Sequence, residues 1–337
     1  KSLSQESAQN IKQKITTESN KNAAFNIISK DHALTTKTLL STNFELFDVY
    51  FKNNGIHLSG WIEKDTKSLQ KARHNVFQFA PYSVDFVHSI TLSNYKIRST
   101  FKGASLEYYN WIGDEMSIMA FESDTVYFVS VKDQTDAALS LEEANLKSSS
   151  ISNPDSLKYE AYNNYKFYRN YAAPKYKTAF SGFINQNVTT PAWYYTSENY
   201  VIFSKTITGL KKYMDLISKS EILSEQPQFS KIYNKYSVEE ASISSYDRTY
   251  TNIENDPVMD VISNGQKFST YTKIGKKTIV ANIFMQQEEM TTATVSSSKR
   301  DTLWQLQIPG LSKIVKSQWF YNHREQLYNI RLVDDQN

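Results

Sequence analysis

Short apolar runs alternate with polar stretches along most of the chain, and most of these runs have the length of a β-strand. Runs of about four to eight residues rich in Val, Ile, Tyr and Phe, bounded by turn-forming residues, are typical of strands. The pattern predicts strands at 24–29, 47–51, 57–62, 84–92, 116–121, 126–131, 159–162, 165–171, 179–184, 192–196, 200–204, 241–247, 268–274 and 278–285. Two asparagine-rich turns, Asn53-Asn54-Gly55 and Asn163-Asn164, predict that the strands beside them form hairpins.

Apolar side chains recur at helical spacing in other segments, which predicts helices between the strands. The predicted helices are 32–40, 68–76, a helix that begins near Asp136, a helix capped by Thr208, and 229–236. Hairpins with interposed helices favour an α+β fold with mixed, largely antiparallel sheets over a parallel doubly wound sheet.

One local pattern occurs four times. An apolar, strand-like run ends in a lysine, and a polar residue suited to cap a helix follows it. The lysines are Lys30, Lys64, Lys132 and Lys205. The last three are 68 and 73 residues apart, so we expect a quasi-repeated β–α module.

Composition divides the chain into four parts. Residues 1–22 are polar and predict a tether, and residues 23–288 hold the α+β domain. Residues 289–300 are rich in Ser and Thr with few large apolar side chains, which is typical of a linker. Residues 301–337 carry short alternating strands separated by turns, as a partial β-propeller blade does.

The chain of 337 residues contains only nine glycines and no glycine-rich phosphate loop. Such loops need glycine because the backbone must come close to the phosphate, so we expect no nucleotide ligand. The formal net charge of +3 is too small to indicate a nucleic-acid partner.

Cysteine is absent, which excludes disulfides, thiolate catalysis and cysteine zinc sites. A chain without cysteine suits an exported bacterial protein. No apolar run reaches the roughly 18 residues that a membrane span needs. The sequence begins with Lys1 rather than Met, so we expect that a leader has been removed and that an N-terminal anchor attaches the protein to a membrane.

The sequence offers no arrangement typical of a catalytic or metal site. Its five histidines are at least 14 residues apart, so none has the spacing of paired zinc ligands on a helix. Neither Ser59-Gly60 nor Ser181-Gly182 has the flanking residues of a nucleophile elbow. We therefore expect no enzyme activity, no metal and no cofactor. Carboxylates that are distant in sequence but converge in the fold leave a hydrolase as an alternative.

Aromatic residues are abundant, with 23 Tyr and 18 Phe. Trp193, Tyr194 and Tyr195 are consecutive, and Tyr168 and Arg169 lie where aromatic and basic residues interleave. These five residues are the predicted binding site, because tyrosine and tryptophan combine a flat apolar ring with a polar group. The alternative for both segments is a strand with one face on the core, which exposes either Tyr194 alone or Trp193 together with Tyr195.

The block Tyr200–Thr206, with Leu210, Tyr213, Phe229 and the run 241–244 after it, resembles an uncharacterised family of exported bacterial proteins that are often anchored to the envelope. The likeness spans roughly residues 23–288. It implies export, and it supplies no catalytic residues.

The C-terminal part resembles the opening blade of quinoprotein-like and outer-membrane-assembly β-propellers. The likeness rests on Leu303-Trp304, Trp319-Phe320, Asn322-His323 and the ending 330–337. Such combinations occur in envelope proteins of the Bacteroidetes type. One partial blade cannot close a ring, so the resemblance implies either further blades or another pairing for this segment.

Three short segments resemble the O-glycosylation pattern of exported Bacteroidetes proteins, in which Asp precedes Thr or Ser and an apolar residue follows. The residues that would carry the glycan are Thr125, Ser156 and Thr302. This resemblance also implies an exported protein.

Together these features predict a non-enzymatic scaffold or binding protein of the cell envelope, in the periplasm or at the outer-membrane surface. We expect it to act through contacts with other envelope proteins, as an accessory subunit of an outer-membrane assembly or secretion complex does. A glycan-binding module that uses exposed Tyr and Trp is one alternative, and a hydrolase with dispersed carboxylates is another.

Overall fold

The structure is a computed structural model, and it describes residues 25–29, 44–52, 55–63, 65–107, 109–151, 153–183, 188–219, 222–236, 241–248, 265–287, 314–322 and 327–334. The predicted tether 1–22, the predicted helix 32–40 and the predicted linker 289–300 lie outside these residues. The described part has an α+β fold with antiparallel strand pairing, as the sequence predicts.

Thirteen strands form one open antiparallel sheet in the order β1-β2-β3-β13-β12-β11-β4-β5-β6-β10-β9-β8-β7. The strands are β1 (Phe25–Ser29), β2 (Phe44–Lys52), β3 (Gly55–Glu63), β4 (Phe86–Thr91), β5 (Ile112–Phe121), β6 (Asp124–Val131), β7 (Tyr159–Tyr162), β8 (Tyr165–Arg169), β9 (Trp193–Thr196), β10 (Tyr200–Ser204), β11 (Ile243–Asp247), β12 (Gly265–Lys273) and β13 (Thr278–Gln287). The strands beside both asparagine-rich segments pair as hairpins, β2 with β3 and β7 with β8. Asn163 has the positive φ, 52°, that such a turn requires.

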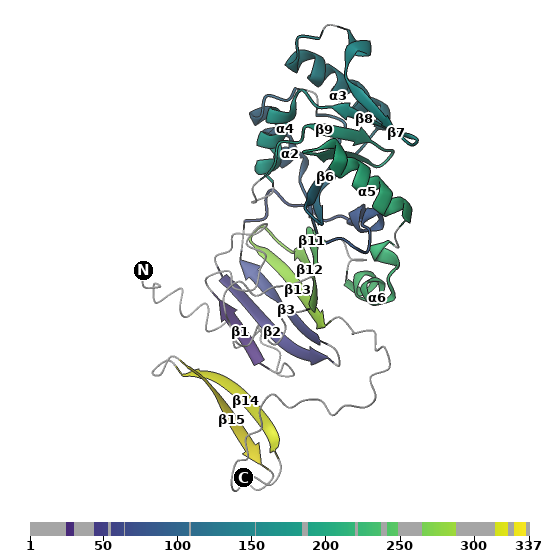
Figure 1. The fold of residues 1–337 in the computed structure, drawn as a ribbon. Coiled ribbons are helices and arrows are strands. Elements are labelled where there is room, and N and C mark those ends of the chain that lie inside the picture. Colours follow the sequence, from purple (N-terminus) through teal and green to yellow (C-terminus); the bar gives the residue numbers. More distant parts are fainter. Residues whose placement is uncertain are drawn as a thin grey trace.

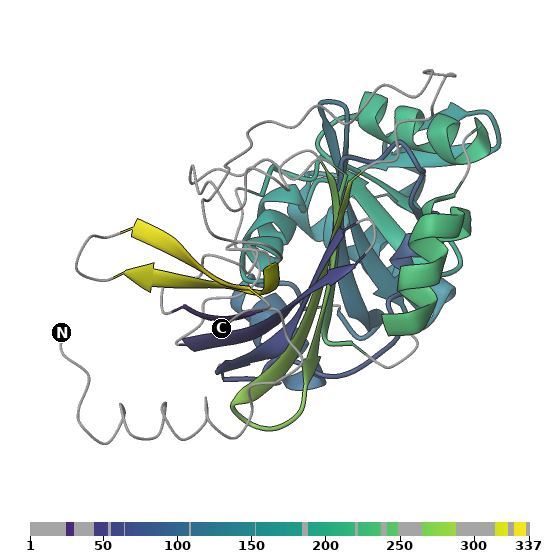
Figure 2. The same cartoon turned by 90° about the horizontal axis from the view of Figure 1, so that it is seen from below.

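The helices are α2 (Asn94–Gly103), α3 (Gln134–Ser148), α4 (Ala173–Ser181), α5 (Ile207–Lys219) and α6 (Pro227–Tyr236), with short 3₁₀ turns η1 (Asn75–Phe79), η2 (Pro154–Ser156) and η3 (Leu223–Glu225). Figure 1 shows α2 and α4 on one side of the sheet and α5 and α6 on the other. Figure 2 shows the same layers from below, with helices flanking the twisted strands.

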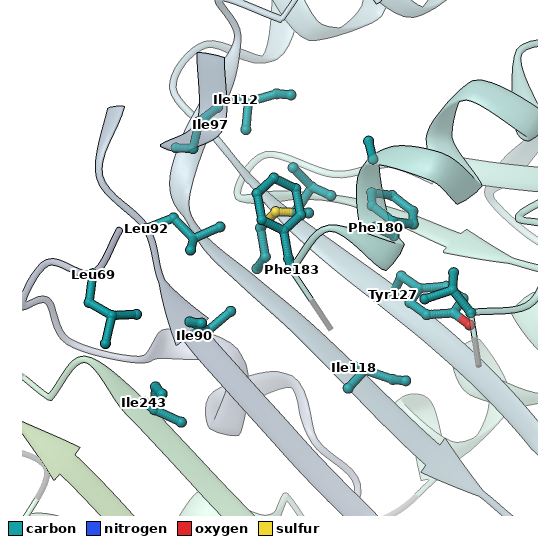
Figure 3. Packing of buried hydrophobic residues seen from close by; sticks show 14 of the residues in the cluster. Leu69, Ile90, Leu92, Ile97, Ile112, Ile118, Tyr127, Phe180, Phe183 and Ile243 are labelled. Carbon is teal, nitrogen blue, oxygen red and sulfur yellow. The ribbon is translucent and has the colours of Figure 1, made fainter. Parts of the chain in front are cut away.

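Each face of the sheet carries its own apolar cluster. One cluster packs Ile97 and Phe180 of the helices against strand residues such as Ile118 and Tyr127 (Figure 3). The cluster on the other face contains the following residues of α5, α6 and the strands: Leu210, Tyr213, Phe229, Tyr233, Val87, Met119 and Phe128. Because side chains alternate between faces, a strand covered on both sides is apolar along its whole length, as 126–129 is.

The repeated lysine pattern precedes an α-helix after β6 and after β10, whereas the segment after Lys30 lies outside the described residues. After β6, Asp133 Oδ1 accepts a hydrogen bond from the Asp136 N–H at 2.9 Å and caps α3. After β10, Thr206 Oγ1 accepts from the Gly209 N–H at 3.0 Å, so Thr206, and not Thr208, caps α5. In the described residues after β3 no α-helix forms before α2.

Two predicted elements are wrong. Residues 68–74 form no helix, and only 75–76 enter the 3₁₀ turn η1. Leu69 pairs with Leu92 and Ala72 with Ala241 in isolated bridges, which hold the segment extended against the sheet. Residues 179–183 of the predicted strand 179–184 are instead the end of α4 and the turn after it. Pro174 lies in the first turn of α4, where proline is compatible with a helix, and the apolar residues that follow face the core.

Helix α2 is absent from the predictions. Ser93 Oγ accepts from the Lys96 N–H at 3.3 Å and starts this helix, whose polar sequence buries only Ile97 and Phe101. Such a thin apolar stripe gives a weak periodic signal.

The described residues of the C-terminal part form a single hairpin, β14 (Ile314–Asn322) with β15 (Leu327–Asp334), as a separate two-stranded sheet. The Leu303-Trp304 segment lies outside the described residues. A propeller blade at 301–337 therefore stays a prediction, and the domain boundaries at 22, 288 and 300 stay predictions too.

Candidate functional site

Strand β5 begins with a β-bulge that shapes the first of two candidate sites. The register between β5 and β6 shifts between Ile112 and Met116, which leaves Gly113, Asp114 and Glu115 out of regular pairing. A Cβ on Gly113 would collide with the Ser130 side chain and lie 3.1 Å from the Ser130 backbone carbon. Ser130 Oγ accepts a hydrogen bond from the Glu115 N–H at 2.9 Å, so the bulge needs both residues.

The Glu115 side chain is 3% exposed and joins segments that are far apart in the sequence. Oε1 accepts hydrogen bonds from the Val76 N–H at 3.2 Å and the Ser89 hydroxyl at 2.9 Å. Oε2 accepts from the Asn75 N–H at 3.2 Å and the Tyr200 hydroxyl at 2.6 Å. Through these hydrogen bonds the carboxyl group of Glu115, on β5, connects the start of η1 to strands β4 and β10.

Burial shifts the ionisation of this cluster. It raises the pKa of Glu115, against the opposing effect of the four hydrogen bonds, and it raises the pKa of Tyr200 together with the neighbouring Glu115 charge. Burial lowers the pKa of His74 to about 4, although hydrogen bonding to the Ala241 carbonyl and the Asp114 charge act in the opposite direction. His74 is therefore a neutral, buried imidazole at pH 7.

Ser89, His74 and Glu115 are the residue types of a nucleophilic triad, but their geometry is that of a structural cluster. His74 Nδ1 lies 2.7 Å from Ser89 Oγ, while Nε2 contacts the Ala241 carbonyl at 3.1 Å. Ser89 is 0% exposed, and Ser117 Oγ donates to it at 2.8 Å. A substrate carbonyl cannot approach such a hydroxyl, so this cluster lacks an accessible nucleophile.

A polar pocket of about 610 Å³ opens beside the β5 bulge. Its walls come from residues 70–79, the start of α2, the ends of β5 and β6 nearest the bulge, and the turn before β10. Five side-chain amides line it: Gln70, Asn75, Gln78, Asn94 and Asn199. Lys132, one of the four lysines of the repeated pattern, also lines the pocket.

The second candidate site is a groove of about 850 Å³ between α3 and the β7–β9 end of the sheet, which we call the tyrosine groove. Tyr168 stacks on Tyr194 with ring centroids 5.6 Å apart, and Tyr159 packs on Tyr168 at 5.9 Å. Lys166 Nζ lies 5.5 Å from the Tyr159 ring centroid. Tyr159 is 55% exposed, whereas Tyr194 is 4% exposed.

The sheet divides the five predicted binding residues between its faces. Tyr168 and Tyr194 lie on the α3 side, where Asn145 Nδ2 donates to the Tyr194 hydroxyl at 3.4 Å and burial raises the pKa of Tyr194. Trp193 and Tyr195 are half-buried on the α5 side, and the Arg169 guanidinium lies 5.3 Å from the Trp193 ring centroid. Tyr195 also lines one end of the tyrosine groove.

The predicted glycosylation residues differ in accessibility. Ser156 is exposed in η2, and Thr125 is half-buried within β6. Thr302 lies outside the described residues.

Glu115 and His74 were not among the residues predicted from the sequence to form a site. One signal was available: Gly113-Asp114-Glu115 interrupts an otherwise apolar strand, and a carboxylate inside an apolar strand needs buried partners. Those partners come from residues 75, 76, 89 and 200, which no sequence spacing connects.

No family model, curated protein or solved structure matches the chain. Within the described residues no helix is both long and apolar enough to cross a bilayer. In the same residues no group of three or more His, Asp or Glu is arranged to hold a metal ion.

Proposed function

We propose that the protein is a non-enzymatic binding protein that recognises an extended segment of another protein at the free edge of β7 and the tyrosine groove beside it. The observation that carries this proposal is the position of β7 as the last strand of the thirteen-stranded sheet. An edge strand presents unpaired backbone groups that an added strand can bond.

The hydrogen-bond pattern of the β7–β8 hairpin identifies which groups face outward. The Arg169 N–H donates to the Lys158 carbonyl at 2.9 Å, so residues 158 and 169 form a hydrogen-bonded pair. Antiparallel pairs alternate, and Tyr159 pairs with Tyr168 while Ala161 pairs with Lys166. The backbone groups of Tyr159 and Ala161 therefore point away from β8, toward the open edge.

The tyrosine groove supplies contacts for alternate side chains of such a segment. Tyr159 and Tyr168 present ring surface on the side of β7 and β8 that faces α3. Pro154 and Leu157 extend the apolar lining. A segment with apolar residues at every second position matches this surface, since strand side chains alternate with a period of two.

The arrangement of Glu115 supports a non-enzymatic role. Both of its oxygens are engaged by two donors each, and the neighbouring Ser89 hydroxyl is buried. We also propose that the protein works at the cell envelope with envelope proteins as partners, which is supported by the absence of cysteine.

The test uses peptides selected on the protein from a displayed library, with affinities measured by calorimetry. Ala161→Pro removes the outward N–H and leaves the inward ladder bonds of residues 160 and 162, because proline is compatible with an edge strand. We expect this variant to weaken peptide binding about tenfold or more, since an edge hydrogen bond is lost and the ring obstructs pairing.

Ala161→Val is the matched control, because it changes the same side chain and keeps the N–H; its affinity should equal that of the parent. Selected peptides should show alternating apolar residues. The proposal is wrong if no peptide is enriched, or if Ala161→Pro binds as tightly as Ala161→Val.

A further inference from the structure

The polar pocket beside the β5 bulge is separate from the tyrosine groove, and the two have no lining residue in common. Its volume of about 610 Å³ falls within the range of small-molecule sites, which is about 300–1,000 Å³. Its chemistry indicates the class of ligand.

Side-chain amides are the most numerous polar group in the lining. Each amide offers both a carbonyl acceptor and an NH₂ donor, which is the combination that a hydroxyl group needs from its partners. Asn75, Gln78, Asn94 and Asn199 are all exposed, and they come from three separate segments around the pocket. A ligand with hydroxyl groups on several sides can therefore meet donors and acceptors in several directions.

Phe79 adds the apolar part of the site. Its ring is half-buried in the pocket wall and packs edge-on against Tyr200 at a centroid distance of 5.2 Å. The carbon-bound hydrogens of a pyranose form an apolar face that packs on aromatic rings, so amides around one ring suit a sugar.

Charges in the pocket nearly balance. Arg73 and Lys132 are the cations of the lining, and Asp114 and Glu115 are its acids. Asp114 already accepts a hydrogen bond from the Gln70 amide at 2.8 Å. A lining with two cationic and two acidic side chains, beside five amides, gives no strong preference for an anion or a cation.

The wall that carries Asn75, Gln78 and Phe79 is held in place before any ligand arrives. Glu115 binds the backbone N–H groups of Asn75 and Val76, and the Tyr213 hydroxyl donates to the Phe79 carbonyl at 3.0 Å. The side chain of Asn75 takes no part in the bond to Glu115, so it stays available to a ligand. A site that is fixed in advance loses less conformational entropy on binding.

We infer that the pocket lined by Asn75, Gln78, Phe79 and Asn199 binds a short, neutral saccharide. Glu115 is a positioning residue of this site, because it acts through the backbone of η1. The ligand class differs from the protein segment proposed for the tyrosine groove, and the two sites can be occupied independently.

The test is calorimetry, together with saturation-transfer NMR, on the full chain with glucose, galactose, N-acetylglucosamine, maltose and cellobiose. At least one neutral sugar should bind with a dissociation constant below about 1 mM. Asn75→Ala and Gln78→Ala should each weaken that binding about tenfold, because a sugar hydroxyl loses its partner. Asn199→Ala, in the turn before β10, tests the same ligand at a residue outside η1.

Gln134→Ala is the control, because this exposed amide lines the tyrosine groove instead; it should leave sugar affinity unchanged. Glucuronate and inorganic phosphate distinguish an anion site from a sugar site. The inference is overturned if no neutral sugar binds, if either anion binds more tightly than every neutral sugar, or if all three pocket variants bind like the parent. Each of these results leaves the peptide test at β7 unaffected.

Discussion

At the scale of single residues, His74 and Glu115 show how one buried cluster moves two pKa values in opposite directions. Both side chains are almost fully buried, with His74 Nδ1 3.9 Å from Glu115 Oε1. Burial disfavours the charged form of each, so the pKa of the base falls and that of the acid rises. Ser89, which contacts both, links the two groups.

The lowered pKa of His74 makes the free energy of unfolding depend on pH. The imidazole has a pKa of 6.5 in the unfolded chain and about 4 in the folded one, so the unfolded chain binds more protons between these values. Stability is therefore full above pH 6.5 and falls as the pH drops toward 4, by about 3 kcal/mol for this group. Glu115 acts in the opposite sense, because its raised pKa adds stability as the pH falls through the folded value.

Comparison with His74→Asn isolates the histidine contribution, because Asn cannot titrate. The difference in free energy of unfolding between parent and variant, from urea curves at pH 7, 6, 5 and 4, should shrink as the pH falls. Asp114 and Glu115 are the neighbouring titrating groups and remain in both proteins. A difference that stays constant from pH 7 to 4 contradicts a buried neutral His74.

At the scale of elements, the β5 bulge depends on Gly113. Gly113→Ala should destabilise the protein by about 1–3 kcal/mol, because the added Cβ meets the Ser130 side chain and backbone. Gly103→Ala is the matched control, since a Cβ there meets nothing within 4 Å. It should leave stability unchanged or raise it by up to about 1 kcal/mol through helix propensity.

A double variant tests whether Ser130 is the obstacle. Ser130→Ala alone should cost about 1 kcal/mol, because the Glu115 N–H loses its acceptor. Combined with Gly113→Ala, the total cost should be smaller than the two single costs added, as measured by urea denaturation. If the cost of the double variant equals the sum of the two single costs, the contact between the added Cβ and the Ser130 hydroxyl is not the source of the strain.

Elements were predictable from the sequence where local chemistry alone decides them. The turn at Asn163 and the cap at Asp133 each use a side chain or a backbone conformation within a few residues. The segment 68–76 was mispredicted because its backbone partners, Leu92 and Ala241, are distant in sequence. The cluster around Glu115 could not be predicted for the same reason. Glu115 binds groups from residues 75, 76, 89 and 200, which are distant in sequence and come together only in the folded sheet.

At the scale of the whole molecule, one sheet separates two apolar clusters, and the same strands contribute side chains to both. Neighbouring residues of the same strand, Ile118 and Met119, belong to different clusters. A strand cannot leave one cluster without disturbing the other, so the two faces should unfold together. The tyrosine groove and the polar pocket lie along this single sheet, which makes their geometry depend on the same cooperative unit.

The C-terminal hairpin should behave differently. In the described residues β14 and β15 pair only with each other, and an isolated two-stranded hairpin is marginally stable in water. A chain that ends at Gln287 should keep its free energy of unfolding within about 0.5 kcal/mol of the full chain. A chain that begins at Phe44 is the contrasting truncation, because it removes β1, which pairs with β2 over five residues. Urea unfolding followed by tryptophan fluorescence should show a loss only for the second truncation, and an equal loss for both would place the hairpin within the cooperative unit.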